Sequence, residues 1–515
     1  MPQGGARGVA DSRDESEQNS AGVLSHLSVS VPLLLSRCRC LCPPSPLRPI
    51  LLCPRPPHVQ ARPSRSARAS ISSRVDRVTI CAFERLRRGS ALVRTSRMYG
   101  FRRNAQGQAC LGASPLSELL HQSGLETPVY FYDLEAIAHE ARSLISGYGD
   151  ARHVIAYAVK ANSAGSVVRT LAAEGTGADV VSAAELELAI ACGIPAQKIV
   201  MSGVAKKDSE LDFAISSRLL AIQAESVEEV FRIKARARAL GRQARVAFRL
   251  NPGVEIESHA HISTGHDKAK FGIARADVGR AFEAVDGAGG ALVAVGLSTH
   301  VGSMLGEVAP YLQSARHVCD VARARRQSHE GLEYVNFGGG FGIDYGSGQA
   351  AAPADFGRAA VQLLRSEGLS GLMLVAEPGR SLVGSHGVLL ARVVQSKVSG
   401  EQSWLMIDAG MNDLLRPALY GAKHRIEALD REPSLPEWRV VGPVCESSDD
   451  FGAHPIGSEP PAAVVIRDAG AYSFTMASEY NGRALPSEVF VKDGVIVGKS
   501  PSPGAAAWIK RRLQA

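Results

Sequence analysis

The sequence predicts a (β/α)8 barrel of the TIM type followed by a C-terminal antiparallel β-domain, and two observations carry this prediction. From about residue 126, short apolar and β-branched runs alternate with longer helical patterns, which is typical of parallel β/α units. Eight such runs fall within roughly 250 residues, the usual length of such a barrel. After residue 384 the pattern changes to strand-like stretches without long helices, which indicates a separate β-domain. A doubly wound sheet is the structural alternative for the first part.

The runs expected to form the barrel strands are residues 153–159, 178–181, 198–201, 219–223, 245–250, 292–297, 333–337 and 372–376. Helical patterns lie between them, for example at residues 183–192 and 227–240. The strand-like stretches of the second part are residues 388–398, 403–408, 439–444, 462–468 and 488–491. The run at 128–132 precedes a helix rather than a barrel unit, so we expect it to complete the β-domain. The predicted domains are a barrel at 133–385 and a β-domain made of 126–132 and 386–515.

The first hundred residues differ in composition from the rest. Of the 58 Lys and Arg and the 51 Asp and Glu in the chain, residues 1–103 hold 18 Arg, no Lys and 6 acids. A segment this rich in Arg, Ser and Pro cannot bury a core, so we expect residues 1–105 to be a disordered or targeting-like extension. Residues 24–97 partly fit an organellar transit peptide, and a translated region ahead of a true start at Met98 is the alternative. A cytoplasmic protein is expected, or one of an organelle stroma if the segment is a transit peptide.

The remaining composition excludes several classes of function. After residue 103 the chain holds 40 bases and 45 acids, so no nucleic-acid surface is expected. No apolar run reaches the about 20 residues that cross a bilayer, so no membrane anchor is expected. Five of the nine cysteines precede residue 82, and the Cys-x-Cys-x-Cys run at 38–42 has no partnering His or Cys cluster, so no metal is expected. The other four cysteines are scattered singly, which is typical of a reducing compartment.

Polar and small residues follow several predicted strands, where barrel enzymes place their active sites. Lys160 ends the first strand, where partial desolvation should lower the pKa of its amine and suit it to form a Schiff base; a lysine extending to solvent is the alternative. His300 follows the sixth strand and could stack on a ring. The glycines at 338–340 offer backbone amides to an anion, and Glu377 ends the eighth strand, where it could keep a pyridine nitrogen protonated. Together these groups predict pyridoxal phosphate as the cofactor.

Longer motifs carry a resemblance to a known family. In the barrel they are residues 157–162 (YAVKAN), 177–182 (GADVVS), 262–265 (ISTG) with 270–272 (KFG), and 377–380 (EPGR). In the second part they are residues 408–413 (DAGMND), 416–420 (RPALY), 442–447 (GPVCES) and 468–472 (DAGAY). From about residue 127 to residue 491 the chain resembles the fold-type III, alanine-racemase-like pyridoxal-phosphate enzymes, and within them the diaminopimelate decarboxylases. The resemblance implies decarboxylation of meso-2,6-diaminopimelate to L-lysine and carbon dioxide, the last step of lysine biosynthesis.

The resemblance also implies roles for matching positions. The catalytic residues would be Lys160, which forms the Schiff base, His300, which stacks on the ring, and Cys445, which supplies the proton that replaces carbon dioxide. Glu377 would meet the pyridine nitrogen. The cofactor-binding residues would be Lys160, Asp179, His300, Gly302, Ser303, Gly339, Gly340, Glu377, Gly379, Arg380 and Tyr472. The substrate-binding residues would be Arg380, Arg416, Tyr420, Glu446 and Tyr472. Cys445 and Glu446 would reach the cofactor of the partner subunit, which implies a homodimer with shared active sites.

Four positions depart from the usual pattern of this family, namely Ser298, Thr299, Met304 and Ser473. None of them removes a catalytic group. The alternatives are a decarboxylase of ornithine, arginine or carboxynorspermidine, and a non-catalytic pyridoxal-phosphate-binding barrel protein. The former needs a pocket for a distal cation, whereas Arg380, Arg416 and Glu446 suit the two opposite charges at the distal end of diaminopimelate. The latter lacks a β-domain, so the decarboxylase reading is favoured.

Overall fold

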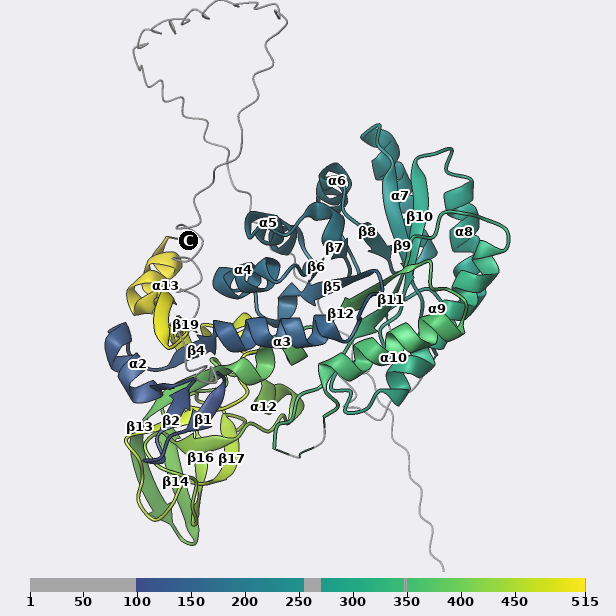
Figure 1. Ribbon diagram of the computed structural model, residues 1–515. Coiled ribbons are helices and arrows are strands. Elements are labelled where there is room, and N and C mark those ends of the chain that lie inside the picture. Colours follow the sequence, from purple (N-terminus) through teal and green to yellow (C-terminus); the bar gives the residue numbers. More distant parts are fainter. Residues whose placement is uncertain (1–98, 254–269, 347, 349, 515) are drawn as a thin grey trace, which may run out of the picture. The chain divides into compact units, whose positions relative to one another are not determined.

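The computed structural model describes residues 99–253, 270–346, 348 and 350–514. Eight parallel strands close into a barrel in the order of the sequence, which confirms the predicted fold class and excludes a doubly wound sheet (Figure 1). The strands are β5 (His153–Ala158), β6 (Gly177–Val180), β7 (Ile199–Met201), β8 (Ala221–Ala224), β9 (Ala244–Arg249), β10 (Leu292–Ser298), β11 (Tyr334–Gly339) and β12 (Met373–Glu377). Each overlaps one of the eight predicted runs.

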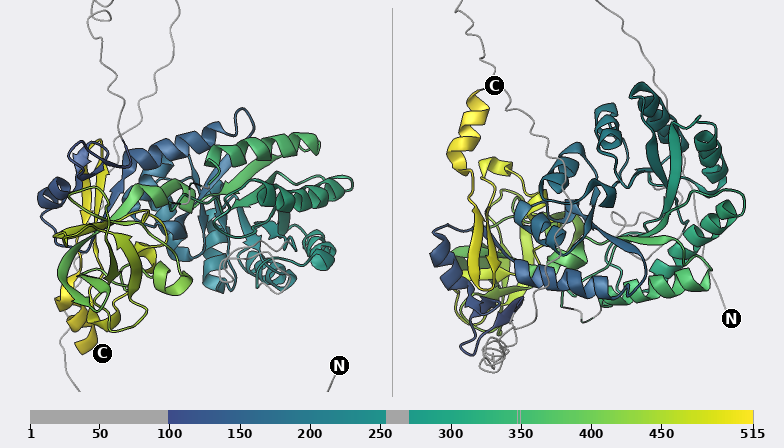
Figure 2. Two further views of the ribbon diagram at one scale, coloured as in Figure 1. Left: turned by 90° about the horizontal axis from the view of Figure 1, so that it is seen from below. Right: turned by 45° about the horizontal axis from the view of Figure 1, so that its top comes forward.

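Helices lie around the barrel strands (Figures 1 and 2). They are α3 (Leu134–Ser146), α4 (Gly165–Ala173), α5 (Ala183–Ala191), α6 (Asp208–Ser217), α7 (Val227–Ala239), α8 (Val278–Asp286), α9 (Ala309–Arg326) and α10 (Pro353–Ser366). The side chains of Asp133, Ser182 and Ser226 accept hydrogen bonds from backbone N–H groups in the first turns of α3, α5 and α7. Such caps provide acceptors for N–H groups that have no partner within the helix, so these three residues set the position at which each helix begins.

The side chains of the barrel strands alternate between two apolar layers. In β5, Val154 belongs to a cluster of strand side chains inside the barrel, whereas Ile155 belongs to the cluster shared with the helices. The interior is tightly filled. A Cβ at Gly296 would lie 2.4 Å from the ring of Tyr334, so a side chain at that position would collide with the ring. Room for a ligand is therefore left at the ends of the strands rather than within the barrel.

A second sheet has the order β17-β16-β14-β13-β4-β19-β20, and β18 pairs with β13 and with β15. The strands are β4 (Val129–Asp133), β13 (Gly387–Ser399), β14 (Gln402–Ile407), β15 (Ile426–Ala428), β16 (Glu437–Val441), β17 (Asp450–Pro455), β18 (Ala463–Ile466), β19 (Ser487–Lys492) and β20 (Val495–Ser500). β4, blue in Figure 1 among green and yellow strands, lies between β13 and β19. The sheet is mixed rather than purely antiparallel, because β4 runs parallel to β19 and β14 runs parallel to β16.

The structure contains several short elements that the sequence analysis did not predict. They are β1 (Phe101–Arg103), β2 (Ala109–Leu111), β3 (Ser114–Pro115), α2 (Leu116–Ser123), α11 (Arg380–Val383), α12 (Arg416–Tyr420) and α13 (Gly504–Leu513). β1 falls inside the segment 1–105 that was expected to be an extension. Arg103 of β1 donates to the carboxylate of Glu427 at 2.7 Å and to the backbone oxygen of Ala428 at 2.8 Å, so β1 is fastened to the second sheet. Residues 1–98 lie outside the described part of the chain, as do residues 262–265 of the family motifs.

Within the described residues, no helix combines the length and the apolar character needed to cross a membrane. Nor do three or more His, Cys, Asp or Glu side chains of this part of the chain gather where they could hold a metal ion.

Candidate active site

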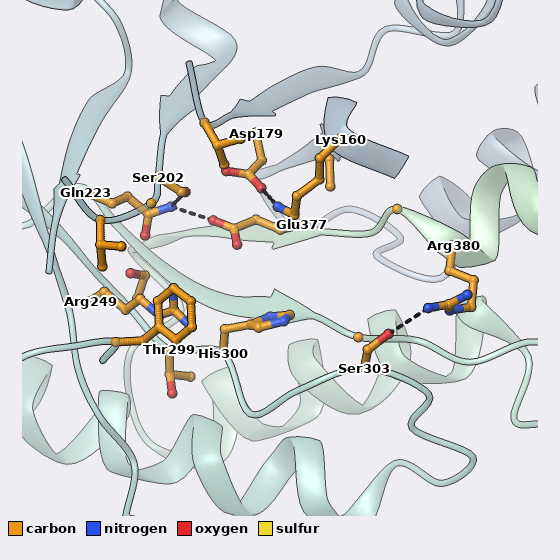
Figure 3. A pocket seen from close by; sticks show the side chains of 18 of the residues that line it. Lys160, Asp179, Ser202, Gln223, Arg249, Thr299, His300, Ser303, Glu377 and Arg380 are labelled. Atoms are coloured by element: carbon orange, nitrogen blue, oxygen red, sulfur yellow. Dashed lines mark hydrogen bonds and ion pairs between the residues drawn. The ribbon is translucent and has the colours of Figure 1, made fainter. Parts of the chain in front are cut away.

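A cavity of about 390 Å³ lies where the barrel strands end, and it is lined by residues that follow them (Figure 3). This size lies within the range of small-molecule sites. Of the residues predicted from the sequence, those that line it are Lys160, Asp179, His300, Ser303, Gly340, Glu377, Gly379, Arg380 and Tyr472. The strand ends therefore bring together residues that are far apart in the sequence, as the position of barrel active sites predicts.

Lys160 lies in η1 (Val159–Ala161), directly after β5. Its Nζ donates a hydrogen bond of 2.6 Å to Oδ2 of Asp179 at the end of β6 (Figure 3). The Lys160 side chain is 42% exposed, toward the cavity, whereas that of Asp179 is 1% exposed. Burial is the largest single influence on the pKa of Lys160 and lowers it, but Asp179, Tyr472 and Glu377 together hold the pKa above its usual value. The predicted lowering of this pKa is wrong, because it left out the carboxylate of the neighbouring strand.

Glu377, at the end of β12, is held by two amides that the sequence did not single out. Its Oε1 accepts hydrogen bonds from Nε2 of Gln223 at 2.5 Å and from Nδ2 of Asn336 at 2.6 Å. Burial raises the pKa of Glu377 to about 7, and the Asp179 carboxylate adds to the rise. The amides and Lys160 act in the opposite direction. Gln223 and Asn336 are each a polar residue within an otherwise apolar strand. This pattern could have identified both amides as site residues from the sequence.

His300 follows β10 and presents a neutral ring. Its Nδ1 accepts a hydrogen bond of 3.3 Å from the backbone N–H of Gly339. Burial lowers the pKa of His300 to about 3, and the positive charges of Arg249 and Lys160 add to the effect. An uncharged imidazole that lines the cavity is suited to stack on a flat ligand ring.

The glycine-rich turn after β11 approaches two other strand ends closely. A Cβ at Gly339 would lie 1.9 Å from the backbone oxygen of Glu377, and one at Gly340 would lie 2.2 Å from that of Gly302. Gly340 also has a φ of +88°, which side chains rarely adopt. Glycine is thus required here by geometry. The backbone N–H of Tyr472 donates to the oxygen of Ala161 at 2.7 Å, and this hydrogen bond joins a loop of the second part of the chain to the barrel.

Two buried arginines share one hydroxyl. Arg380 and Arg416 are 6% and 4% exposed, and Nη1 of each donates to the Tyr345 hydroxyl, at 2.8 Å and 2.9 Å. Nη1 of Arg416 also donates at 2.8 Å to Nε2 of His424, whose Nδ1 donates to the backbone oxygen of Arg467. Burial lowers the pKa of His424 to about 3, with the positive charge of Arg416 as the next cause, so this histidine is a neutral acceptor.

Neither Arg380 nor Arg416 forms an ion pair with a carboxylate among the described residues. Two buried positive charges without an acid make the region attractive to an anion. Arg380 lines the cavity, and Tyr345 links Arg416 to it. Sequence reasoning missed Tyr345 and His424, because only the folded chain brings them to the two arginines.

Six predicted residues do not line this cavity. Gly302 and Gly339 are next in sequence to residues that do, and Arg416 shares the Tyr345 hydroxyl with Arg380, whereas Cys445, Glu446 and Tyr420 lie apart from the cavity. Cys445 and Glu446 are exposed in the loop between β16 and β17, where the backbone N–H of Cys445 donates to the Asn481 side chain at 2.9 Å. Glu446 accepts a hydrogen bond from the hydroxyl of Tyr480. Tyr420 ends α12 and does not line the cavity either. The chain by itself therefore does not bring these groups to Lys160.

The cavity residues fit pyridoxal phosphate. Lys160 offers an amine for the aldehyde, His300 a neutral ring face, and Glu377 a carboxylate for the ring nitrogen. Buried polar atoms around the cavity are left without a partner among the described residues: Oδ1 of Asp179, Oγ of Ser298 and Nε of Arg380. A polar ligand would satisfy such atoms.

Comparison with known proteins identifies the family. The model of the pyridoxal-dependent decarboxylase pyridoxal-binding domain matches residues 134–384. The chain is 37% identical over 390 residues to the diaminopimelate decarboxylase of Zymomonas mobilis, covering 75% of this chain and 92% of that protein. It is 34% identical over 396 residues to the enzyme of Aquifex aeolicus, covering 76% and 92%. The crystal structure of diaminopimelate decarboxylase from M. jannaschii in complex with L-lysine matches this chain with a TM-score of 0.75 at 32% identity, covering 80% of this chain and 97% of that one. The chain therefore belongs to the diaminopimelate decarboxylase family, whose members are pyridoxal-phosphate-dependent enzymes of lysine biosynthesis.

Proposed function

We propose that this chain converts meso-2,6-diaminopimelate to L-lysine and carbon dioxide in the cavity at the barrel strand ends, as a homodimer with shared active sites. The observation that supports this proposal is that a set of cofactor-binding residues and an anion site lie next to each other. Lys160, His300 and Glu377 suit the cofactor, and the pair Arg380 and Arg416 offers an anion site beside them.

The cofactor half of the site would be built by the barrel. Pyridoxal phosphate, when bound, supplies an electron sink for the bond to the departing carboxylate. Lys160 would hold it covalently, and Asp179 would fix the amine and exchange a proton with its Nζ, since the two atoms are 2.6 Å apart. His300 would support the ring and Glu377 would meet the ring nitrogen. The phosphate would be held by Gly302, Ser303, Gly339 and Gly340, by the backbone around Gly379, and by the hydroxyl of Tyr472.

The substrate half would read the distal end of diaminopimelate. Arg380, Arg416 and Tyr420 would bind the distal carboxylate, with Tyr472 close by, and Glu446 would bind the distal ammonium. Ornithine and arginine carry only a cation at that end, and two buried guanidinium groups would repel it. No carboxylate of the described residues neutralises the two arginines, so they would favour a substrate with a distal carboxylate over one with only a distal cation.

The partner subunit would complete the site. Cys445, the proposed proton donor, and Glu446 are exposed and lie outside the cavity of their own chain. This position supports a role in the cavity of a second copy. We further propose a cytoplasmic location, or an organelle stroma if residues 24–97 are a transit peptide, and a division into a barrel at 133–385 and a β-domain at 126–132 and 386–515. The pairing of β4 with β13 supports the assignment of residues 126–132 to the β-domain.

Carbon dioxide release from meso-diaminopimelate, with ornithine, arginine and lysine as comparators, tests the reaction. Subunit complementation tests the shared site. A random mixture of Lys160→Ala and Cys445→Ala chains, unfolded and refolded together, should give about half hybrid dimers, each with one complete site, and therefore roughly a quarter of wild-type activity.

The matched control mixes Lys160→Ala with His300→Ala. Both changes lie in the barrel half, so no hybrid regains a complete site and no rescue is expected. If the Lys160→Ala and Cys445→Ala mixture shows no more activity than the average of its parents, with subunit exchange confirmed, Cys445 serves its own chain and the shared site is refuted.

A further inference from the structure

Glu377 is held on one side only. Its Oε1 accepts two N–H donors, from Gln223 on β8 and from Asn336 on β11, whereas no hydrogen bond to its Oε2 is recorded within the described part of the chain. The side chain lines the cavity. Figure 3 shows the Gln223 amide between Ser202 and Glu377, and the dashed lines mark its two hydrogen bonds.

The Asn336 amide is fixed in the orientation that donates to Glu377, and the Gln223 amide is held by a second hydrogen bond. Oδ1 of Asn336 accepts a hydrogen bond of 2.8 Å from the backbone N–H of Gly338, so its NH2 group must face the carboxylate. Nε2 of Gln223 donates to Oγ of Ser202 at 2.9 Å as well as to Glu377. Asn336 and Gln223 are fully buried, so neither amide can turn freely to solvent.

The two donors are also uncharged. Asp179, the other carboxylate of the cavity, is paired with the cation of Lys160. Glu377 forms no ion pair with a described Lys or Arg, and only the amides bond to it. Neutral donors stabilise the ionised carboxylate without contributing a positive charge that would compete with a protonated ligand nitrogen.

We propose that Gln223 and Asn336 are positioning residues that hold Glu377 by Oε1 as a carboxylate and leave Oε2 to accept the N–H of the bound pyridine ring. This inference rests on the proposed role of Glu377 at the ring nitrogen. Burial raises the pKa of Glu377 to about 7, and the hydrogen bonds from Asn336 and Gln223 act against this rise. Loss of either amide would raise the pKa of Glu377, shift the proton of the ring N–H toward the carboxylate, and weaken the binding of the ring nitrogen.

The experiment compares two cofactors on the full chain after removal of its own cofactor. One is pyridoxal phosphate, and the other is its 1-deaza analogue, in which a C–H replaces the ring nitrogen. The readout is the ratio of their dissociation constants, measured by protein fluorescence, and not activity. Gln223→Met should reduce the wild-type preference for pyridoxal phosphate by about tenfold, because one hydrogen bond to a charged group is lost.

Ser202→Ala is the matched control, because it removes the other hydrogen bond of the same amide and leaves the donor to Glu377 in place. Its cofactor preference should stay within about twofold of wild type. Glu377→Gln should remove most of the preference, because an amide cannot hold the ring nitrogen in its charged form.

The outcomes separate the two proposals. If Glu377→Gln keeps the wild-type preference, the proposed role of Glu377 fails. If Glu377→Gln loses it but Gln223→Met keeps it, the positioning role is overturned while the proposed function stands. If Gln223→Met is poorly folded, Asn336→Ala provides the same comparison. The ¹⁵N NMR shift of ring-labelled cofactor should report a less protonated nitrogen in either amide variant, and an unchanged shift would overturn the inference.

Discussion

Replacing Tyr345 by Phe tests the anion site directly. The change removes the hydroxyl that accepts from Arg380 at 2.8 Å and from Arg416 at 2.9 Å, and it keeps the ring whose face lies 5.1 Å from the Arg416 guanidinium. Hydrogen bonds to charged groups contribute about 1.5–3 kcal/mol each. The free variant enzyme loses both bonds, whereas a bound substrate carboxylate would accept the released donors and recover about one of them, so substrate binding should strengthen by roughly 1.5–3 kcal/mol, which corresponds to a fall in KM of about 10- to 150-fold.

The turnover number should change by less than about threefold, because an interaction made equally by bound substrate and transition state affects KM alone. The assay is the initial rate of carbon dioxide release as a function of diaminopimelate concentration. Tyr334→Phe is the matched control, since the buried Tyr334 hydroxyl has no hydrogen-bond partner among the described residues. A KM for Tyr345→Phe within about twofold of wild type, or a fall in kcat at unchanged KM, would refute the reasoning.

Four further predictions concern catalysis and stability. Lys160→Ala should abolish turnover and the absorbance of covalently bound cofactor while the circular dichroism spectrum is unchanged; an active variant would sink the mechanism. A chain that starts at Met98 should keep the specific activity and the thermal midpoint of the full chain, since residues 1–97 lack apolar periodicity. Arg103→Ala should lower the free energy of unfolding in urea by about 2–3 kcal/mol, less than for a fully broken buried pair because Arg467 still bonds Glu427 at 3.0 Å. Burial raises the pKa of Glu488 to about 7, so its contribution to stability is present below pH 4.5 and is lost as the pH rises through 7. Glu488→Gln should remove about 3 kcal/mol of this pH dependence between urea unfolding at pH 4.5 and pH 7.5, and an unchanged dependence would show that this carboxyl is not responsible.

The fold could be predicted from the sequence because each barrel strand is a short apolar run bounded by helical periodicity. The position of Lys160, His300 and Glu377 followed from the same reasoning, since each comes within three residues after the end of such a run. Elements without a strong pattern were missed. The strands β1 to β3 are only two or three residues long, and α13 consists largely of small and basic residues.

Contacts between distant segments were the second limit. The raised pKa of Lys160 depends on Asp179, which is close only because β5 and β6 are neighbours. The bridge from Arg380 to Arg416 through Tyr345 joins three segments whose side chains show no shared pattern in the sequence. Local patterns predict which residues end a strand, but the through-space partners that set their charge appear only when the barrel closes.

The place of β4 beside β13 has a consequence for synthesis and folding. The two strands are antiparallel neighbours, with Tyr132 opposite Gly387, so the barrel stands where a β-hairpin would have its loop. Closure entropy rises only slowly with loop length, so the sheet tolerates so large an insertion. On the ribosome, however, β4 emerges before the barrel, and its partners β13 and β19 emerge after it. The backbone N–H and C=O groups on both edges of β4 therefore stay unpaired until the barrel has been synthesised. A barrel that folds slowly would prolong the time in which β4 can pair with other chains.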